Sequence, residues 1–173
     1  MVKIVKKKVN LLNKCKKIKV VLSDVDGVLT DGGMYYTENG DYMKKFHARD
    51  GMGVNILRRN NIPTIIITKE KNKIIEQWAK RMKVTKLYQG IIQKESLTDE
   101  ICQTFNIVPS QLAYIGDDIN DVELLKKVGL SAAPSDCIPL VKKNCDYVCA
   151  SSGGNAAFRE VADLIIESQK RKK

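Results

Sequence analysis

Two aspartates separated by one residue end an apolar segment near the start of the chain. Asp24 and Asp26 follow the run KVVLS, residues 19–23, and Gly27 then permits a sharp turn. Like charges a few ångströms apart repel, so two adjacent carboxylates favour a divalent cation or a shared proton. Such carboxylates can act as a nucleophile or as a general acid and base. An isolated D-x-D can also be an ordinary turn that caps a helix, so further motifs must decide.

A second acidic cluster follows another short strand-like segment. After AYI, Gly116 leads into a predicted helix that carries Asp117, Asp118 and Asp121. Asp117 and Asp121 would face the same way on its first turn, where the helix N-terminus partly offsets their charge. Alone this is an ordinary acidic helix start, but together with the first pair it supplies oxygen ligands for Mg²⁺. Zinc is disfavoured, because the chain has a single His and no paired C-x-x-C motif.

Two side chains between these clusters suit phosphate binding. Thr68 ends the apolar run IPTIII, and Lys94 follows the strand-like KLYQG after a short connection. A hydroxyl can donate to a phosphate oxygen, and an ammonium can neutralise charge on a transferred phosphoryl group. Each has an ordinary alternative, Thr68 as a helix N-cap and Lys94 as one of many surface lysines.

These residues need a scaffold that brings several strand ends together. Strand-like segments alternate with helix-like ones, which predicts an α/β fold with a doubly wound, mainly parallel, Rossmann-like sheet. The strands are expected near 18–23, 62–68, 85–89, 111–116, 130–133 and 146–149, and the helices near 51–60, 71–83, 93–106, 118–128, 136–143 and 155–169. Ligands bind such sheets at the carboxyl ends of the strands, where the candidate residues lie.

One insertion interrupts this alternation. Residues 32–47, GGMYYTENGDYMKKFH, contain two β-rich runs around Asn39-Gly40 and predict a hairpin that is too small to be a cap domain. It carries the apolar side chains Met34, Tyr35, Tyr36, Tyr42, Met43 and Phe46. A lone two-stranded arm cannot shelter them, so we predict a homo-oligomer, with packing on the parent domain as the alternative.

The order of these motifs resembles the haloacid-dehalogenase-like phosphohydrolase superfamily. The chain has D-x-D-G-x-x-T, then Thr68 after a strand, then Lys94, then G-D-D-x-x-D. The resemblance implies that Asp24 is the nucleophile that forms an aspartyl-phosphate. It implies that Asp26 protonates the leaving alcohol and then activates water.

The same resemblance implies a metal and phosphate site. Mg²⁺ would be bound by the Asp24 carboxylate, the Asp26 main-chain carbonyl and Asp117. Thr68 and Lys94 would hold the phosphoryl group, and Asp121 would orient Lys94 or the metal-bound waters.

A finer resemblance covers residues 18–168, through DVDGVLTDGG, the hairpin, KKFHARDGMG, LYQG, AYIGDDIND, VGLSAAPSD and GGNAAFRE. It is similar to capless, tetrameric phosphatases of 3-deoxy-ulosonic acid phosphates, namely 3-deoxy-octulosonate 8-phosphate or nonulosonate 9-phosphates of the sialic acid type. The resemblance implies substrate contacts at Gly33, Lys69, Glu70 and Arg159. Arg159 would reach the substrate across a subunit interface, or it is simply a helix-surface arginine.

One departure bears on the substrate. Octulosonate-type members usually have T-G-R after the second strand, whereas this chain has Thr68, Lys69 and Glu70. Replacing the arginine with Glu70 removes a bidentate donor for a carboxylate and adds a hydrogen-bond acceptor. This departure favours the nine-carbon substrate slightly.

The net charge of +10 comes from the two ends of the chain. Residues 1–19 hold eight lysines and residues 170–173 four basic groups, so subtracting these twelve leaves −2 for the rest. We therefore predict a basic tail over 1–17, one domain over 18–169 and a second basic tail over 170–173, with no specific nucleic-acid partner. No apolar run approaches a membrane span, and we expect a cytoplasmic protein with reduced cysteines and no membrane partner.

Two rival functions stay open. A domain of this kind also occurs as a non-catalytic oligomerisation module fused to sialic-acid cytidylyltransferases, although every catalytic position is present here. The chain can also be a phosphatase for another sugar or nucleotide monophosphate, because the catalytic motifs do not define the leaving group.

Overall fold

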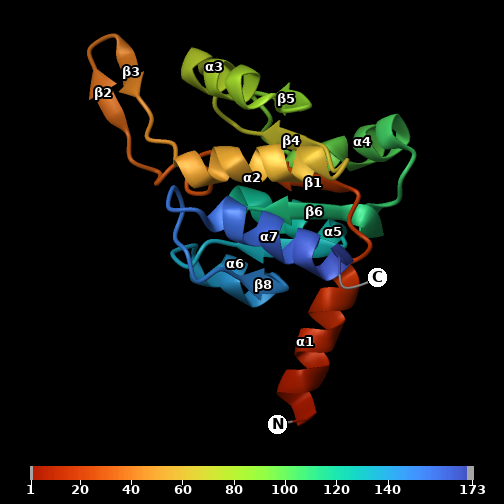
Figure 1. Ribbon diagram of the computed structural model, residues 1–173. Helices are drawn as coiled ribbons and strands as arrows, with labels where there is room; N and C mark the ends of the chain where they lie inside the picture. The colour runs from red at the N-terminus through yellow and green to blue at the C-terminus, as the bar shows by residue number, and fades with distance from the viewer. Residues whose placement is uncertain (1, 171–173) are drawn as a thin grey trace.

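The six predicted strands form one parallel sheet in the order β5-β4-β1-β6-β7-β8 (Figure 1). The computed structural model describes residues 2–170 of the chain. The strands are β1 (Val20–Ser23), β4 (Thr64–Ile67), β5 (Lys86–Tyr88), β6 (Leu112–Ile115), β7 (Leu130–Ala133) and β8 (Tyr147–Val148). Because β4, β1 and β6 are neighbours, the loops that follow them meet at one edge of the sheet.

Helices cover both faces of the sheet, as the doubly wound prediction requires. They are α1 (Val2–Cys15), α2 (Ala48–Arg59), α3 (Lys73–Met82), α4 (Thr98–Phe105), α5 (Val122–Lys127), α6 (Pro139–Asn144) and α7 (Ala157–Lys170), with short 3-10 helices η1 (Lys94–Leu97), η2 (Pro109–Gln111) and η3 (Ile119–Asp121). Alternate residues of β1 face opposite sides: Val21 packs with α2 and α7, and Leu22 packs with α4 and α5. The fold prediction is confirmed, and the described residues contain no cap domain.

The predicted N-terminal tail is wrong in its structure. Residues 2–15 form α1, which contacts α7, and Cys15 and Ile18 are buried in the core. Leu11 and Cys15 lie four residues apart, a helical spacing that the many lysines obscured. At the other end α7 continues to Lys170, and residues 171–173 of the predicted C-terminal tail lie outside the described residues.

The inserted segment forms the predicted hairpin. Strands β2 (Tyr35–Thr37) and β3 (Gly40–Met43) pair antiparallel and project from the domain beside α2 (Figure 1). Tyr36 is 62% and Tyr42 is 72% exposed, so these aromatic side chains do not pack on the parent domain. Phe46 differs from the prediction, because it stacks on Trp78 with ring centroids 4.7 Å apart. The tip of the hairpin is exposed and its base is anchored.

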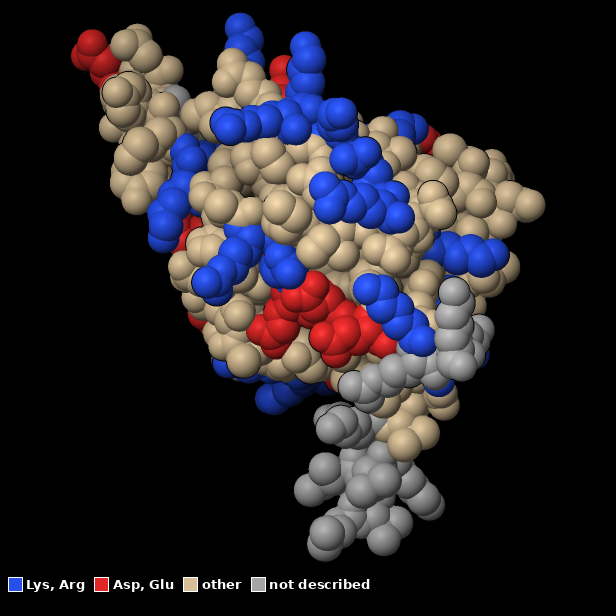
Figure 2. Space-filling view, in the orientation of Figure 1, with Lys and Arg blue, Asp and Glu red and all other residues tan. Residues whose placement is uncertain are grey.

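Charges of both signs share one face of the molecule. Figure 2 shows acidic side chains gathered over α7, with Lys and Arg above them over α2 and α3. This face is therefore not a uniformly basic surface. Among residues 2–170, none of the helices combines the length and the apolar character that crossing a membrane requires.

Candidate active site

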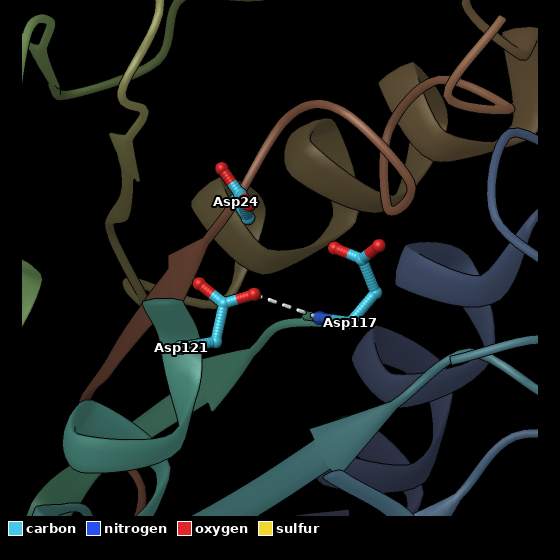
Figure 3. Close-up of side chains that lie close together, drawn as sticks. All are labelled: Asp24, Asp117 and Asp121. Carbon is cyan, nitrogen blue, oxygen red and sulfur yellow. Dashed lines mark hydrogen bonds between the residues drawn. The ribbon is translucent and has the colours of Figure 1, made fainter. Parts of the chain in front are cut away.

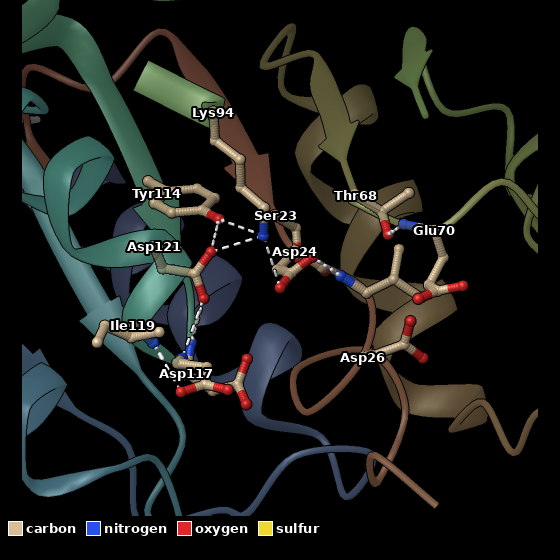
Figure 4. A network of polar contacts seen from close by, with 12 residues as sticks. Ser23, Asp24, Asp26, Thr68, Glu70, Lys94, Tyr114, Asp117, Ile119 and Asp121 are labelled. Carbon is tan, nitrogen blue, oxygen red and sulfur yellow. Dashed lines mark hydrogen bonds and ion pairs between the residues drawn. The ribbon is translucent and has the colours of Figure 1, made fainter. Parts of the chain in front are cut away.

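The carboxyl ends of three adjacent strands enclose a pocket of about 150 Å³. Asp24 follows β1, Thr68 follows β4 and Asp117 follows β6 after one glycine, so parallel pairing brings residues far apart in sequence together (Figure 4). The Asp24 N–H donates to the Ile115 carbonyl at 3.0 Å, which joins two of these loops. The pocket is lined by Asp24, Asp26, Thr68, Lys69, Glu70, Asp117, Asp118 and Asn120.

Lys94 lies inside the protein and not on its surface. It begins η1, its side chain is fully buried, and Nζ lies 2.7 Å from Asp24 Oδ2 and 2.6 Å from Asp121 Oδ1. The Tyr114 hydroxyl is 3.3 Å from the same nitrogen. Burying an ammonium is costly without opposite charge, so this contact set explains how the lysine is tolerated. The surface-lysine alternative is wrong.

Asp121 uses both of its oxygens within the protein. Oδ1 accepts from Lys94 and from the Tyr114 hydroxyl, while Oδ2 accepts from the N–H groups of Asp117 at 2.9 Å and Asp118 at 3.1 Å. The prediction that Asp117 and Asp121 share one face of a helix is wrong, because η3 begins at Ile119 and Asp117 lies before it. Figure 3 shows Asp121 reaching back to the Asp117 backbone. Its contacts orient Lys94 and the Asp117 loop.

Asp24 and Asp117 have the properties of cation ligands. Oxygens of Asp24, Asp117 and Asp121 lie within 4.8 Å of one another, and Asp117 Oδ1 is buried without a hydrogen-bond partner in the described structure. Burial raises the pKa of Asp24 to about 7, although Lys94 opposes this effect. Burial and the charge of Asp24 raise the pKa of Asp117 to about 8. A hard divalent cation such as Mg²⁺ would stabilise the ionised form of both carboxylates, and their oxygens are the donors that it prefers.

Gly27 makes room for one of these ligands. Its φ of +83° lies in the left-handed region, and a Cβ placed there would lie 2.0 Å from Asp117 Oδ2. The glycine therefore provides the turn after the D-x-D motif and also the space for the Asp117 carboxylate.

Asp26 has a partner that sequence reasoning missed. Its Oδ1 lies 2.8 Å from Lys44 Nζ and 3.2 Å from Thr30 Oγ1. Lys44 directly follows β3, at the base of the hairpin, and only 4% of its side chain is exposed. The spacing of Lys44 contains no signal for this contact, since the turn of the hairpin decides which residue returns to the site. Tyr114 was also missed, because it resembles any apolar strand residue.

The four predicted substrate residues fall into two groups. Lys69 and Glu70 line the pocket, and the Glu70 N–H donates to Thr68 Oγ1 at 3.2 Å. The Thr68 N-cap alternative is wrong, because Asn72 caps α3. Gly33 and Arg159 are not among the residues that line the pocket.

Arg159 is held on the surface of α7 within this chain. Its side-chain Nε lies 2.9 Å from both carboxylate oxygens of Asp163. Its backbone N–H donates to Oδ1 of buried Asp50 at 2.9 Å. A role for Arg159 in the site of a neighbouring subunit stays a prediction.

The chain is similar to known phosphatases over nearly its whole length. The model of the haloacid dehalogenase-like hydrolase family matches residues 5–160. The 3-deoxy-D-manno-octulosonate 8-phosphate phosphatase KdsC of Salmonella typhi is 38% identical over 160 residues, covering 92% of this chain and 85% of the relative.

Solved structures show the same likeness. The 3-deoxy-D-manno-octulosonate 8-phosphate phosphatase of Yersinia pestis superposes with a TM-score of 0.91 at 38% identity, covering 94% of this chain and 88% of that one. The enzyme of the same name from Moraxella catarrhalis, in complex with magnesium ion, phosphate ion and KDO, gives a TM-score of 0.89 at 31% identity, covering 93% and 92%.

Proposed function

The chain belongs to the haloacid dehalogenase-like hydrolases and is a phosphoric monoester hydrolase, and from this premise we propose its substrate and mechanism. The substrate is the terminal phosphomonoester of a 3-deoxy-ulosonic acid phosphate, which is hydrolysed through an aspartyl-phosphate on Asp24. The observation that carries the proposal is the buried Lys94 between Asp24 and Asp121, beside the pocket at the strand ends.

The residues of the pocket divide the reaction into two displacements. An Asp24 oxygen attacks phosphorus while Asp26 gives a proton to the leaving alcohol, and Asp26 then takes a proton from the water that cleaves the acyl phosphate. Lys94 holds Asp24 in place and supplies positive charge, and the Thr68 hydroxyl offers a donor to the phosphoryl oxygens. Mg²⁺, held by Asp24, Asp117 and the Asp26 carbonyl, would neutralise charge on the phosphoryl group.

The first candidate substrate is 3-deoxy-octulosonate 8-phosphate. The relatives from Salmonella typhi and Yersinia pestis are named for it, and the Moraxella relative binds KDO with magnesium and phosphate. A nonulosonate 9-phosphate is the second candidate. It is supported by Glu70, which lines the pocket and offers an acceptor where a carboxylate-binding arginine is expected for the eight-carbon substrate.

The exposed hairpin supports a homo-oligomer, and we propose a tetramer. Met34 is 63% exposed, and Tyr36 and Tyr42 are exposed beside it, a set of apolar side chains that a second copy would cover. Light scattering should give four times the mass of the chain. A compact monomer would exclude this assembly.

A kinetic panel tests the proposed function. Initial rates would be measured on the two ulosonate phosphates and on other sugar and nucleotide monophosphates, with Mg²⁺ and with a chelator. We expect metal-dependent turnover that favours an ulosonate phosphate. Equal rates across the panel would remove the substrate assignment, and no turnover of any ester would favour the non-catalytic oligomerisation module.

A further inference from the structure

Two motifs that carry no catalytic side chain are joined to each other and to the turn after the D-x-D motif. The first is RDGMG, residues 49–53, at the start of α2, and the second is GGNAAFRE, residues 153–160, which leads into α7. Neither motif contributes a residue to the lining of the pocket. The segment 150–156, which contains the two glycines of the second motif, is called the glycine loop below.

Asp50 joins the two motifs. Its side chain is fully buried, Oδ2 accepts the N–H of Ala156 at 3.2 Å, and Oδ1 accepts the N–H of Arg159 at 2.9 Å. The first N–H groups of a helix have no acceptor within the helix, so Asp50 supplies one for α7. Ala156 has a φ of +77°, a backbone conformation that alanine rarely adopts unless its surroundings enforce it. Asp50 therefore holds the end of the glycine loop in a disfavoured conformation.

Two further carboxylates hold the rest of the glycine loop by its backbone. Glu160, on the first turn of α7, accepts the N–H groups of Ala150 at 2.9 Å and Ser151 at 3.0 Å. Asp136 accepts the N–H of Gly153 at 3.0 Å. The loop is therefore fixed along its length by acceptors from three separate parts of the chain.

The glycine loop packs on the turn that follows Asp26. The Gly154 N–H donates to the Val28 carbonyl at 3.0 Å. A Cβ placed at Gly153 would lie 2.0 Å from the Gly27 carbonyl oxygen, so the two backbones are in direct contact. Any larger residue at this position would push against the turn.

Gly27 also contacts a candidate metal ligand. Its carbonyl oxygen faces Gly153, and a Cβ built on its own Cα would lie 2.0 Å from Asp117 Oδ2. The turn therefore touches the glycine loop and the Asp117 carboxylate through the same residue. A shift of the loop toward Gly27 would displace the turn relative to Asp24 and Asp117.

We propose that Asp50 and the glycine loop are positioning elements that fix the turn after the D-x-D motif and thereby the relative placement of the Asp24 and Asp117 carboxylates. The inference rests on the proposed phosphatase function and adds to it a support that lies outside the pocket. These residues act through backbone contacts and do not touch the substrate. Groups that orient metal ligands govern metal affinity although they do not bind the ion.

The test compares two glycines that face the same obstacle at opposite edges of the sheet. In Gly153→Ala the added Cβ would lie 2.0 Å from the Gly27 carbonyl oxygen, and in Gly129→Ala it would lie 2.0 Å from the Ser110 carbonyl oxygen. Gly129 directly precedes β7, at the edge of the sheet remote from the pocket. Both variants should therefore lose stability to a similar degree in urea unfolding.

The Mg²⁺ affinity of the folded proteins, measured by titration calorimetry, distinguishes the two variants. We expect Gly153→Ala to weaken Mg²⁺ binding by about tenfold or more, and to lower kcat at saturating Mg²⁺ with the best ester of the panel by a similar factor. Gly129→Ala should leave both quantities unchanged. A defect confined to folding would lower the stability of both variants without changing the affinity of the folded protein.

A second pair of variants tests Asp50 itself. Asp50→Asn keeps the shape of the side chain but turns one acceptor into an amide donor, which faces an N–H group. We expect the same selective loss of Mg²⁺ affinity, to a smaller degree. Asp163→Asn removes a carboxylate that is 42% exposed on α7 and should leave affinity and kcat unchanged. If Gly153→Ala does not fold, as judged by circular dichroism, the result with Asp50→Asn decides.

The outcomes separate this inference from the proposed function. Mg²⁺ affinity that stays unchanged in Gly153→Ala, or that falls equally in Gly129→Ala, would overturn the positioning role. Wild-type protein that binds Mg²⁺ but hydrolyses no ester of the panel would instead overturn the proposed function, and a loss of affinity in Gly153→Ala would still support the positioning of the two carboxylates.

Discussion

The two aspartates of the D-x-D motif have different surroundings: on the sheet side Asp24 belongs to a buried ion network, and on the hairpin side Asp26 pairs with Lys44. On the sheet side, Lys94 is fully buried between two carboxylates, and Asp121 has every oxygen engaged by donors. On the hairpin side, 31% of the Asp26 side chain is exposed and Oδ2 has no partner in the described structure. The Lys94 network is therefore buried and paired, whereas the Asp26–Lys44 pair is partly solvated.

This difference predicts different effects on stability. Removing any one member of a buried ion network is strongly destabilising, because it leaves an uncompensated charge in a medium of low polarity. The Asp26–Lys44 pair is partly solvated, so we expect changes on the hairpin side to cost less stability than changes on the sheet side.

The largest expected effect is that of Asp24→Asn. The amide keeps the shape of the Asp24 side chain but is a poor nucleophile, so we expect kcat to fall by about 10³-fold or more while the protein stays folded. Steady-state kinetics and circular dichroism check this. Normal turnover by the variant would contradict the role of Asp24.

Lys94→Met on the sheet side should cost more stability than Lys44→Met on the hairpin side. Removing the ammonium leaves Asp24 and Asp121 facing each other, and we expect the free energy of unfolding at neutral pH to fall by about 3–5 kcal/mol. Lys44→Met should lower the free energy of unfolding by about 1 kcal/mol or less, because its partner Asp26 is partly solvated. Urea unfolding measures the stability of both variants. Equal losses of stability would contradict the difference between the sheet side and the hairpin side.

Gly27→Ala tests the space reserved for Asp117. The added Cβ would meet Oδ2 and strain a backbone with positive φ, so we expect Mg²⁺ affinity, measured by titration calorimetry, to fall by about tenfold and stability by about 1–2 kcal/mol. Gly40→Ala is the control, because nothing lies within 4 Å of its Cβ position although its φ is also positive. Unchanged Mg²⁺ affinity in Gly27→Ala would show that this space is not needed.

A further prediction concerns the pH dependence of stability in the metal-free protein. The folded pKa values of Asp24 and Asp117, about 7 and about 8, lie above the ordinary 3.8, so the folded state binds more protons than the unfolded state between these limits. Stability should therefore fall as pH rises from about 4 to about 8. Mg²⁺, which binds the ionised carboxylates, should restore it increasingly with pH.

Thermal unfolding in a chelator and in Mg²⁺, at about pH 5 and about pH 8, measures this effect. Asp117→Asn removes one of the two carboxylates and should flatten the pH dependence. A metal-free protein that is more stable at the higher pH would contradict the sign.

Much of the scaffold was predictable because its signals are local. Short apolar runs indicated all six strands and placed Asp24, Thr68 and Asp117 after three of them. The hairpin was indicated by Asn39-Gly40. The helix over residues 2–15 was missed, because its many lysines obscured the spacing of the apolar residues that pack on the domain.

The choice of partners within the site was not predictable. Lys94 was one of many lysines until the sheet order brought it to Asp121, 27 residues away, and Lys44 and Lys45 are equivalent in sequence but meet different environments. Residue type states what a side chain can donate or accept. It does not state what the fold places beside it.

The sequence by itself determined the strand pattern, the family and the kinds of groups that carry the chemistry, because these depend on neighbouring residues and short motifs. Only the tertiary structure decided that Lys94 is buried, which donors reach the oxygens of Asp121 and which oxygen of Asp26 pairs with Lys44. These contacts join distant segments, and their energies depend on burial, which exists only once the sheet has formed.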